Sequence, residues 1–323
     1  RCVIIGAGIV GNCLAGHLSD LGWTDIMLTN TTAELILKAL GYQPTQTLLG
    51  LNVTYDALKR GDMDVFLGNW RPVQDTDFKA FFDEGSVIPV ATNLEGAKYT
   101  LAVPKYVADA GVKSFDDLAA HGDKFTRTIY GIEPGSNQPL LDMITQKRHG
   151  LDKDWQVVES SEAAMLAQVR RAVGNKDWIV FLGWQPHPMN VTMEMSYLSG
   201  GDAEFGPNYG GATVRTIVRK GYPELCPNVT KLFTNLVFDI DYENTGMNMI
   251  MTDSEEVPAA AKTMMEKHPE KVAAWLAGVD LASAPAGADG VASRPARPRR
   301  SRNTPCAPIR FQNHHGIEKR IGR

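Results

Sequence analysis

The sequence has no excess of positive charge and no long apolar run. Its 33 Lys and Arg face 37 Asp and Glu, for a net charge of −4, which gives no basis for binding nucleic acid or an anionic membrane. No apolar stretch approaches the roughly 20 residues of a bilayer-spanning helix. A signal peptide is not expected, because residue 1 is Arg and no basic region precedes an apolar segment.

Catalytic and metal-binding motifs are also scarce. There is no G-x-S-x-G turn, no H-E-x-x-H and no P-loop. His187 stands between prolines with no second His or Cys at ligand spacing, so no metal site is expected. Cys2, Cys13, Cys226 and Cys306 are widely spaced and match no zinc pattern. They permit a disulfide without demanding one.

What the chain does contain is ordinary globular sequence for about two domains. It has 323 residues, of which 43% are hydrophobic and 22% charged. Helical patterns alternate with short apolar runs, which favours α/β structure with mainly parallel sheets. A helix is expected over residues 31–40, with capping-box spacing at Thr31 and Glu34 and a stop at Gly41.

Two apolar runs end in the same way, with Gly and then Trp. They are Val-Phe-Leu-Gly-Asn-Trp70 and Val-Phe-Leu-Gly-Trp184, and a looser version, Gly22-Trp23-Thr-Asp25, precedes a helix. Such runs read as buried parallel strands. Ligands of open α/β sheets bind beyond the carboxyl ends of the strands, so these Trp side chains are predicted to meet at a ligand site.

Ring faces are the means of binding a quaternary ammonium, which carries charge but has no N–H to donate. Each contact with a ring contributes roughly 0.5–2 kcal/mol. Tyr99, near the start of a predicted strand, is either a fourth wall or a core Tyr with its hydroxyl satisfied. The alternative for the Trp residues is that they cap the core.

The first residues suggest a different chemistry. Gly6, Gly8 and Gly11 form G-x-G-x-x-G after an apolar strand, and residues 1–28 resemble the N-terminus of an FAD-dependent dimethylglycine or sarcosine dehydrogenase. The expected acidic end of a second strand is missing, because Ile26-Met-Leu is followed by Thr29-Asn30. FAD binding is therefore not expected, and no cofactor is predicted.

A second resemblance covers most of the chain. Leu67-Gly-Asn-Trp70-Arg-Pro, Lys98-Tyr99-Thr-Leu-Ala, Tyr130-Gly-Ile-Glu-Pro-Gly135, Phe181-Leu-Gly-Trp184-Gln-Pro-His-Pro and Phe205-Gly-Pro-Asn-Tyr-Gly-Gly follow one another in order. Over residues 20–280 the chain resembles the choline-binding branch of the choline/glycine-betaine substrate-binding proteins of ABC importers. Family members often carry an acidic residue after the last Trp, where this chain has Gln185.

The resemblance implies a two-lobed periplasmic-binding-protein fold of type II, each lobe a mainly parallel sheet flanked by helices and the two joined by a hinge. Residues 13–102 and 212–280 would form lobe 1, and 103–211 lobe 2. Outside the resemblance, residues 1–12 are a glycine-rich lead-in, and the Pro-, Ala- and Arg-rich composition of 281–323 predicts a disordered basic tail. The resemblance also implies a Cys13–Cys226 disulfide, which fits an oxidising periplasm. Residues 14–21 make a poor first strand for lobe 1.

The implied function is capture of choline between the lobes and its delivery to an ABC permease in the inner membrane. The predicted ligand-binding residues are Trp23, Asp25, Trp70, Tyr99, Ser136, Asn137 and Trp184, with Asp25 as counter-charge and Ser136 or Asn137 near the ligand hydroxyl. Glycine betaine or proline betaine is the rival ligand. The alternatives of a different class are a fragment of a flavin methylamine oxidoreductase and a cytosolic domain without a ligand.

Overall fold

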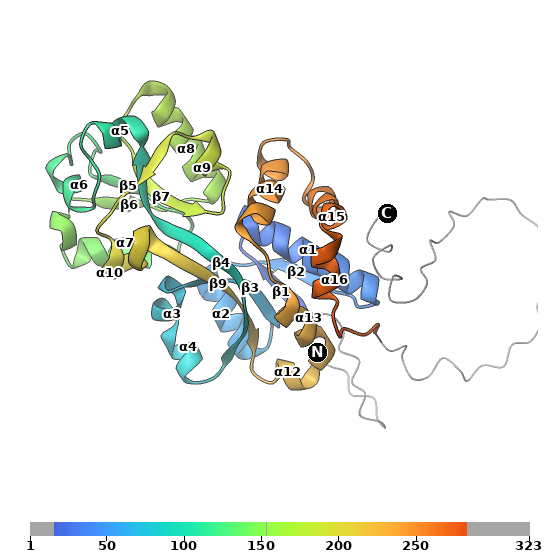
Figure 1. Ribbon diagram of the computed structural model, residues 1–323. Coiled ribbons are helices and arrows are strands. Elements are labelled where there is room, and N and C mark those ends of the chain that lie inside the picture. Colours follow the sequence, from blue (N-terminus) through green and yellow to red (C-terminus); the bar gives the residue numbers. More distant parts are fainter. Residues whose placement is uncertain (1–15, 153, 283–323) are drawn as a thin grey trace, which may run out of the picture.

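The computed structural model describes residues 16–152 and 154–282. Figure 1 shows two groups of elements joined by two long strands, β4 and β9. The predicted boundaries between the lobes, after residue 102 and before residue 212, fall within these strands. We use the predicted ranges to name lobe 1 and lobe 2 below. Gly6, Gly8, Gly11, Cys13 and the predicted tail from residue 283 onward lie outside the described residues.

The nine strands of the described residues form one sheet. Its order is β2-β1-β3-β9-β4-β7-β5-β6, with β8 paired to β4. The strands are β1 (His17–Asp20), β2 (Thr45–Leu48), β3 (Val65–Arg71), β4 (Val87–Pro104), β5 (Thr128–Tyr130), β6 (Gln156–Val158), β7 (Val180–Gln185), β8 (Met195–Tyr197) and β9 (Gly211–Arg219).

Parallel pairing is confined to the two ends of the sheet. In lobe 1, β1 pairs in parallel with β2 and β3. In lobe 2, β5 pairs in parallel with β6 and β7. The centre is antiparallel, because β9 returns the chain between β3 and β4 and β4 also pairs with β7. Each lobe therefore keeps a parallel sheet, and antiparallel strands connect the two.

Helices flank the sheet in both lobes (Figure 1). Lobe 1 has α1 (Thr24–Leu40), α2 (Leu51–Arg60), α3 (Val73–Asp77), α4 (Lys79–Asp83), α12 (Tyr222–Leu225), α13 (Pro227–Asn235), α14 (Ile240–Met251), α15 (Val257–Lys267) and α16 (Pro269–Trp275). Lobe 2 has α5 (Lys105–Asp109), α6 (Asp116–Ala120), α7 (Gln138–Thr145), η1 (Arg148–Gly150), α8 (Glu162–Asn175), α9 (Met189–Thr192), α10 (Asp202–Phe205) and α11 (Pro207–Gly210).

The start of the first helix differs from the prediction. The stop at Gly41 is confirmed, and this residue takes a left-handed φ of 98°. The predicted capping box is wrong, because α1 begins at Thr24 and Thr31 lies buried inside it. Ile26-Met-Leu, taken as a strand in the dinucleotide pattern, is also part of this helix. The doubtful first strand of lobe 1 is present as β1, paired with β2 from His17 onward.

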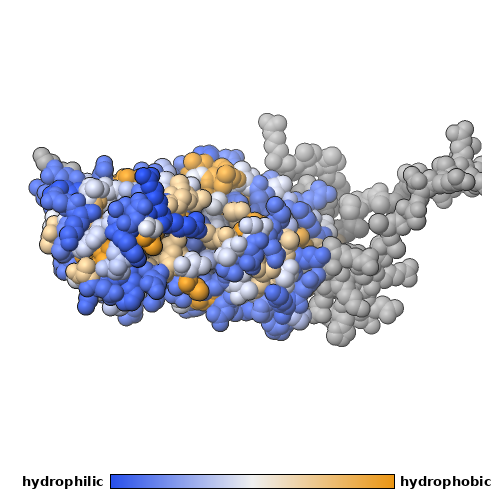
Figure 2. Space-filling view, turned by 90° about the horizontal axis from the view of Figure 1, so that it is seen from above, coloured by the Kyte–Doolittle hydropathy of each residue, from blue (hydrophilic) through white to orange (hydrophobic). Residues whose placement is uncertain are grey.

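A continuous apolar core underlies both lobes. Trp275 belongs to it, as it is 1% exposed and packs against Phe238 and Tyr242. The surface in Figure 2 is mainly hydrophilic, with apolar residues in small patches. Among the described helices, none has the length and apolar character to span a bilayer. Cys226 is disulfide-bonded, and its predicted partner Cys13 lies outside the described residues.

Candidate functional site

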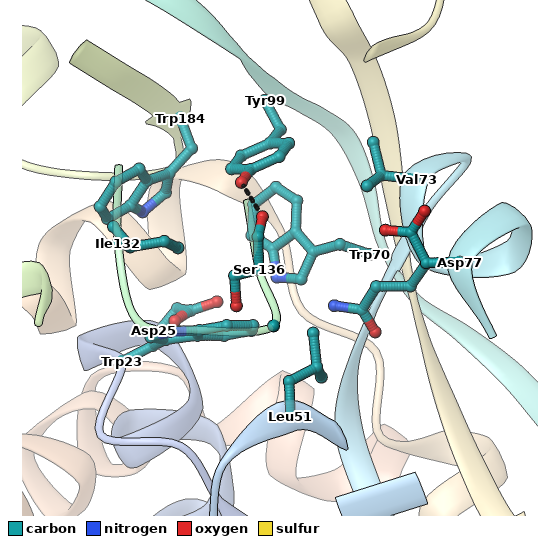
Figure 3. Close-up of a pocket in the computed structure, with 12 residues that line it drawn as sticks. Trp23, Asp25, Leu51, Trp70, Val73, Asp77, Tyr99, Ile132, Ser136 and Trp184 are labelled. Carbon is teal, nitrogen blue, oxygen red and sulfur yellow. Dashed lines mark hydrogen bonds between the residues drawn. The ribbon is translucent and has the colours of Figure 1, made fainter. Parts of the chain in front are cut away.

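A pocket lies where the two lobes meet, with about 480 Å³ of space free of protein atoms. Its lining comes from both lobes and is mainly aromatic and apolar (Figure 3). The lining residues are Trp23, Asp25, Leu51, Trp70, Val73, Gln74, Asp77, Tyr99, Ile132, Gly135, Ser136 and Trp184. Six of the seven predicted ligand-binding residues are among them, and Asn137 is not.

The sheet brings the aromatic walls together from distant parts of the chain. Trp70 is near the end of β3 and Trp184 near the end of β7, while Tyr99 on β4 lies opposite Trp184 in the antiparallel register. The ring centroids of Trp70 and Tyr99 are 6.2 Å apart at 52°. In Figure 3 the rings of Trp184 and Tyr99 lie on one side of the pocket and that of Trp23 on the other.

The glycines before these Trp residues are needed for packing. A Cβ at Gly68 would lie 2.7 Å from Cδ1 of Ile26, on α1. A Cβ at Gly183 would lie 3.0 Å from both Ala102 and Tyr197. Glycine therefore lets α1 and β4 approach the strand ends closely. The repeated Leu-Gly pattern reflects this close approach as well as the delivery of Trp.

Carboxyl groups supply the electrostatics of the pocket. Asp25, in the first turn of α1, is 6% exposed. Burial, reinforced by the nearby Glu162 charge, raises the pKa of Asp25 to about 7, although an indole hydrogen bond from Trp70 acts in the opposite direction. Behind it on α14, burial and the Asp25 charge raise the pKa of Glu243 well above its usual range. Asp25 is thus a proton-sensitive negative charge at the pocket wall.

Asp77 is a second carboxyl in the lining, and sequence reasoning missed it. It lies at the end of α3, where part of its surface is open to solvent and part faces the pocket. Partial burial and the charge of Asp142, on α7 of lobe 2, raise its pKa to about 6. Asp77 lies seven residues after Trp70, in a polar segment that also contains Asp75. Nothing in the sequence distinguishes it there from an ordinary surface carboxylate. The other lining residues not predicted are Leu51, Val73, Gln74, Ile132 and Gly135.

Ser136 and Asn137, the two residues predicted to lie near the ligand hydroxyl, are neighbours in the polar loop after β5. Only one of them lines the pocket. Ser136 lines the pocket, and its main-chain oxygen accepts a 2.9 Å hydrogen bond from the Tyr99 hydroxyl. Asn137 is completely buried. Its amide oxygen accepts from the Ile132 N–H, and its amide nitrogen donates to the main-chain oxygens of Ile132 and Glu133. Asn137 therefore holds the loop in shape rather than facing the pocket.

The side-chain donors of the lining are largely engaged by protein acceptors. Five lining residues donate a side-chain hydrogen bond to a protein acceptor: Trp23 to Glu133, Trp70 to Asp25, Gln74 to the Gly68 carbonyl, Tyr99 to the Ser136 carbonyl, and Ser136 to Glu133. None of the described residues that line the pocket is Lys, Arg or His. What the pocket offers is ring surface and carboxylate oxygen.

His187, the one residue weighed as a metal ligand, has other partners. It is 1% exposed. Its Nδ1 accepts a 3.0 Å hydrogen bond from the Met189 N–H, and its Nε2 lies 3.2 Å from Oε1 of Glu162. The described residues contain no group of three side chains placed to hold a metal ion.

Comparison with known proteins identifies the family. The substrate-binding domain of ABC-type glycine betaine transport systems, OpuAC, matches residues 17–267. The chain belongs to this family. An ABC-transporter choline-binding protein in complex with choline is 49% identical to this OpuAC domain, with a TM-score of 0.82 over 83% of this chain and 93% of that one.

Two further relatives extend the comparison. An ABC-transporter choline-binding protein in an unliganded, semi-closed conformation is also 49% identical, with a TM-score of 0.77 over 86% of this chain and 96% of that one. Glycine betaine/carnitine transport binding protein GbuC of Listeria monocytogenes is 31% identical over 160 residues, which are 49% of this chain and 52% of GbuC.

Membership of the OpuAC family establishes the class of activity. The chain is the substrate-binding component of an ABC transporter, a transport protein rather than an enzyme, and its partner is the permease. The two-lobed type II fold predicted from the sequence is confirmed by the solved structures. The resemblance to a flavin dehydrogenase has no support, since the family match begins at residue 17, beyond Gly6, Gly8 and Gly11.

Proposed function

We propose that the pocket binds choline through the rings of Trp23, Trp70, Tyr99 and Trp184, with Asp25 as the counter-charge. The observation that carries the proposal is the pocket lining itself, in which ring faces and carboxyls occur without a basic side chain. A quaternary ammonium gains from ring faces without needing an acceptor for an N–H. The relatives that bind choline support the same reading.

The hydrogen-bond inventory favours choline over glycine betaine. A betaine carboxylate needs donors or a positive charge, and removing it from water without them is costly. The donors of Trp23, Trp70, Gln74, Tyr99 and Ser136 already serve protein acceptors. The choline hydroxyl instead donates a hydrogen bond, for which the carboxylates of Asp25 and Asp77 are potential acceptors. A zwitterion would also place its negative end near these carboxylates.

The proposed location is the periplasm. The family serves importers, whose binding proteins work outside the inner membrane, and the disulfide at Cys226 fits an oxidising compartment. No cofactor is needed for capture and release of a small cation.

Calorimetric titration of the purified protein with choline, acetylcholine and glycine betaine tests the ligand. We expect choline to bind at least about tenfold more tightly than glycine betaine, a difference of about 1.4 kcal/mol. Trp184→Ala removes one ring contact of roughly 0.5–2 kcal/mol and should raise the choline Kd by about 2- to 30-fold.

Trp178→Ala is the matched control. Trp178 is a partly buried Trp of the same lobe that packs against His121 and Phe125 and does not line the pocket. Its replacement should leave the choline Kd within about twofold of wild type. Normal choline binding by Trp184→Ala, or tighter binding of glycine betaine by wild type, would contradict the proposal.

A further inference from the structure

Behind the pocket, one buried carboxylate touches both lobes. Glu162 begins α8 in lobe 2 and is 5% exposed. Its Oε2 accepts a 3.0 Å hydrogen bond from the main-chain N–H of Thr24, in lobe 1, and its Oε1 accepts a 2.7 Å hydrogen bond from the Thr24 hydroxyl. Thr24 is the first residue of α1, whose own N-cap, Trp23, provides no side-chain hydrogen bond. The carboxylate of one lobe therefore caps a helix of the other.

The same carboxylate is held from within its own lobe by His187. The Met189 N–H donates to Nδ1 of His187, so a neutral imidazole carries its proton on Nε2. That Nε2–H faces Oε1 of Glu162 at 3.2 Å. The imidazole also packs edge-on against the indole of Trp184, with ring centroids 4.9 Å apart at 65°.

These contacts form a chain from one wall of the pocket to the opposite wall. Trp184 contacts His187, His187 donates to Glu162, and Glu162 binds Thr24. Thr24 lies between Trp23 and Asp25, which both line the pocket. We call Glu162 with Thr24 and His187 the Glu162 bridge. A second contact between the lobes runs beside it, from the Trp23 indole N–H to Glu133.

We propose that Glu162 is a positioning residue that holds the two lobes closed over the ligand without touching it. Separation of the lobes would break both hydrogen bonds to Thr24 and leave the carboxylate with His187. The bridge thus stabilises the closed state, both in the ligand-bound protein and in those ligand-free molecules whose lobes are together. It does not contribute to the first encounter between the ligand and separated lobes. Because most affinity differences among variants of one site appear in the dissociation rate, its loss should act there. This inference takes its ligand, choline, from the proposed function. The holding role of Glu162 is inferred separately, from its hydrogen bonds between the lobes.

The experiment compares Glu162→Ala with wild type in two measurements. Stopped-flow binding of choline should show dissociation at least about fivefold faster and association within about twofold. Hydrogen exchange of the amides at the start of α1, measured without ligand, should be faster in the variant because the Thr24 N–H loses its acceptor. Glu162→Gln keeps one acceptor oxygen and should show a smaller effect in both.

Two further variants distinguish the loss of the Glu162 bridge from a general loss of stability in lobe 2. Glu204→Gln changes another buried Glu of lobe 2, whose partners Arg148 and His149 lie in the same lobe, and should match wild type in both measurements. Thr24→Val removes one donor of the bridge and should give an intermediate dissociation rate. Combined with Glu162→Ala it should add little, because both changes remove the same contact.

Unchanged dissociation or unchanged amide exchange in Glu162→Ala would overturn the inference, as would an equal effect of Glu204→Gln. If wild type fails to bind choline, the proposed function fails. The exchange measurement without ligand then still tests whether Glu162 holds the Thr24 amide, independently of the identity of the ligand.

Discussion

At the residue scale, the binding properties of the pocket depend on which lining side chains are already hydrogen-bonded to other protein groups. Its aromatic side chains line the cavity, and the polar groups of Trp23, Trp70 and Tyr99 donate hydrogen bonds to protein acceptors. Burial raises the pKa of the Tyr99 hydroxyl, so it remains a donor to the Ser136 carbonyl at physiological pH. The carboxylates of Asp25 and Asp77 are the negatively ionisable groups of the lining, which suits a cation.

We expect ligand binding to depend on pH, because Asp25 is the proposed counter-charge and its pKa is raised toward neutrality. Its pKa of about 7 means that the ligand-free side chain gains a proton as the pH falls through neutrality. A bound cation favours the ionised form, so the choline Kd should rise as pH falls from 8 to 5, by at most about tenfold per pH unit for one linked proton. Calorimetry in buffers of different ionisation enthalpy should detect proton release on binding near pH 6.5.

Asp25→Asn is the matching variant. It should bind choline more weakly at pH 8, and its Kd should vary less with pH. For folding, a carboxyl whose pKa is raised in the native state destabilises the ligand-free protein as pH rises from about 4 to 7. The variant should therefore melt a few degrees higher than wild type at pH 8 without ligand. A steep pH dependence in Asp25→Asn would assign the proton to Glu133, Glu243 or Asp77, whose pKa values are also raised.

At the element scale, the close approach of α1 to β3 positions Trp23 and Asp25 beside Trp70. Gly68 permits this contact, because any Cβ there would meet Ile26 of α1 and Phe66. Gly68→Ala should destabilise the fold by about 1–3 kcal/mol through overpacking and weaken choline binding by displacing the start of α1. Denaturant unfolding and calorimetry measure the two effects.

Gly174→Ala is the control for that change. Gly174 lies in the last turn of α8, and a Cβ there would meet nothing within 4 Å. Alanine should leave binding unchanged and stabilise the helix by up to about 1 kcal/mol. Equal stability losses in the two glycine variants would mean that the contact at Gly68 relaxes without cost.

The elements also show how far the sequence predicts the site. The strand ends carrying Trp70 and Trp184 could be read from short apolar runs that stop at Gly. The start of α1 could not, because Thr24 to Thr32 is rich in Thr and Asn, which favour helices weakly. Nor could the full length of β4, which contains Pro89, Asn93 and Gly96.

Polar partners were the hardest part to predict. Asn137 is a buried polar residue in a glycine-containing loop, and sequence alone does not distinguish one that stabilises the loop from one that faces a ligand. The contact between Glu162 and Thr24 joins residues 138 positions apart. Local periodicity carries no information about such pairs, whereas strand ends are aligned by the sheet itself.

At the scale of the whole molecule, the disulfide at Cys226 anchors the start of α13 in lobe 1. We predict that its partner is Cys13. Cys226→Ser and Cys13→Ser should lower the Tm alike, at a cost of about 2–5 kcal/mol, and the double variant should be no less stable than either. Mass spectrometry of an unreduced digest should yield the linked peptides.

Cys2→Ser and Cys306→Ser provide the comparison, and both should melt as wild type. A loss of stability in Cys2→Ser equal to that in Cys226→Ser would assign the disulfide to Cys2 and refute the predicted pairing. Choline affinity should change little in any of these variants, because Cys226 does not line the pocket.

Three of the six Trp residues line the pocket, namely Trp23, Trp70 and Trp184. Half of the indole fluorophores of the molecule therefore stand within contact of any occupant, and an entering cation alters the polarity and solvent exposure that set their emission. If the proposed site is right, the protein carries its own optical reporter in the pocket that holds its ligand, and occupancy can be followed by ultraviolet fluorescence without a dye.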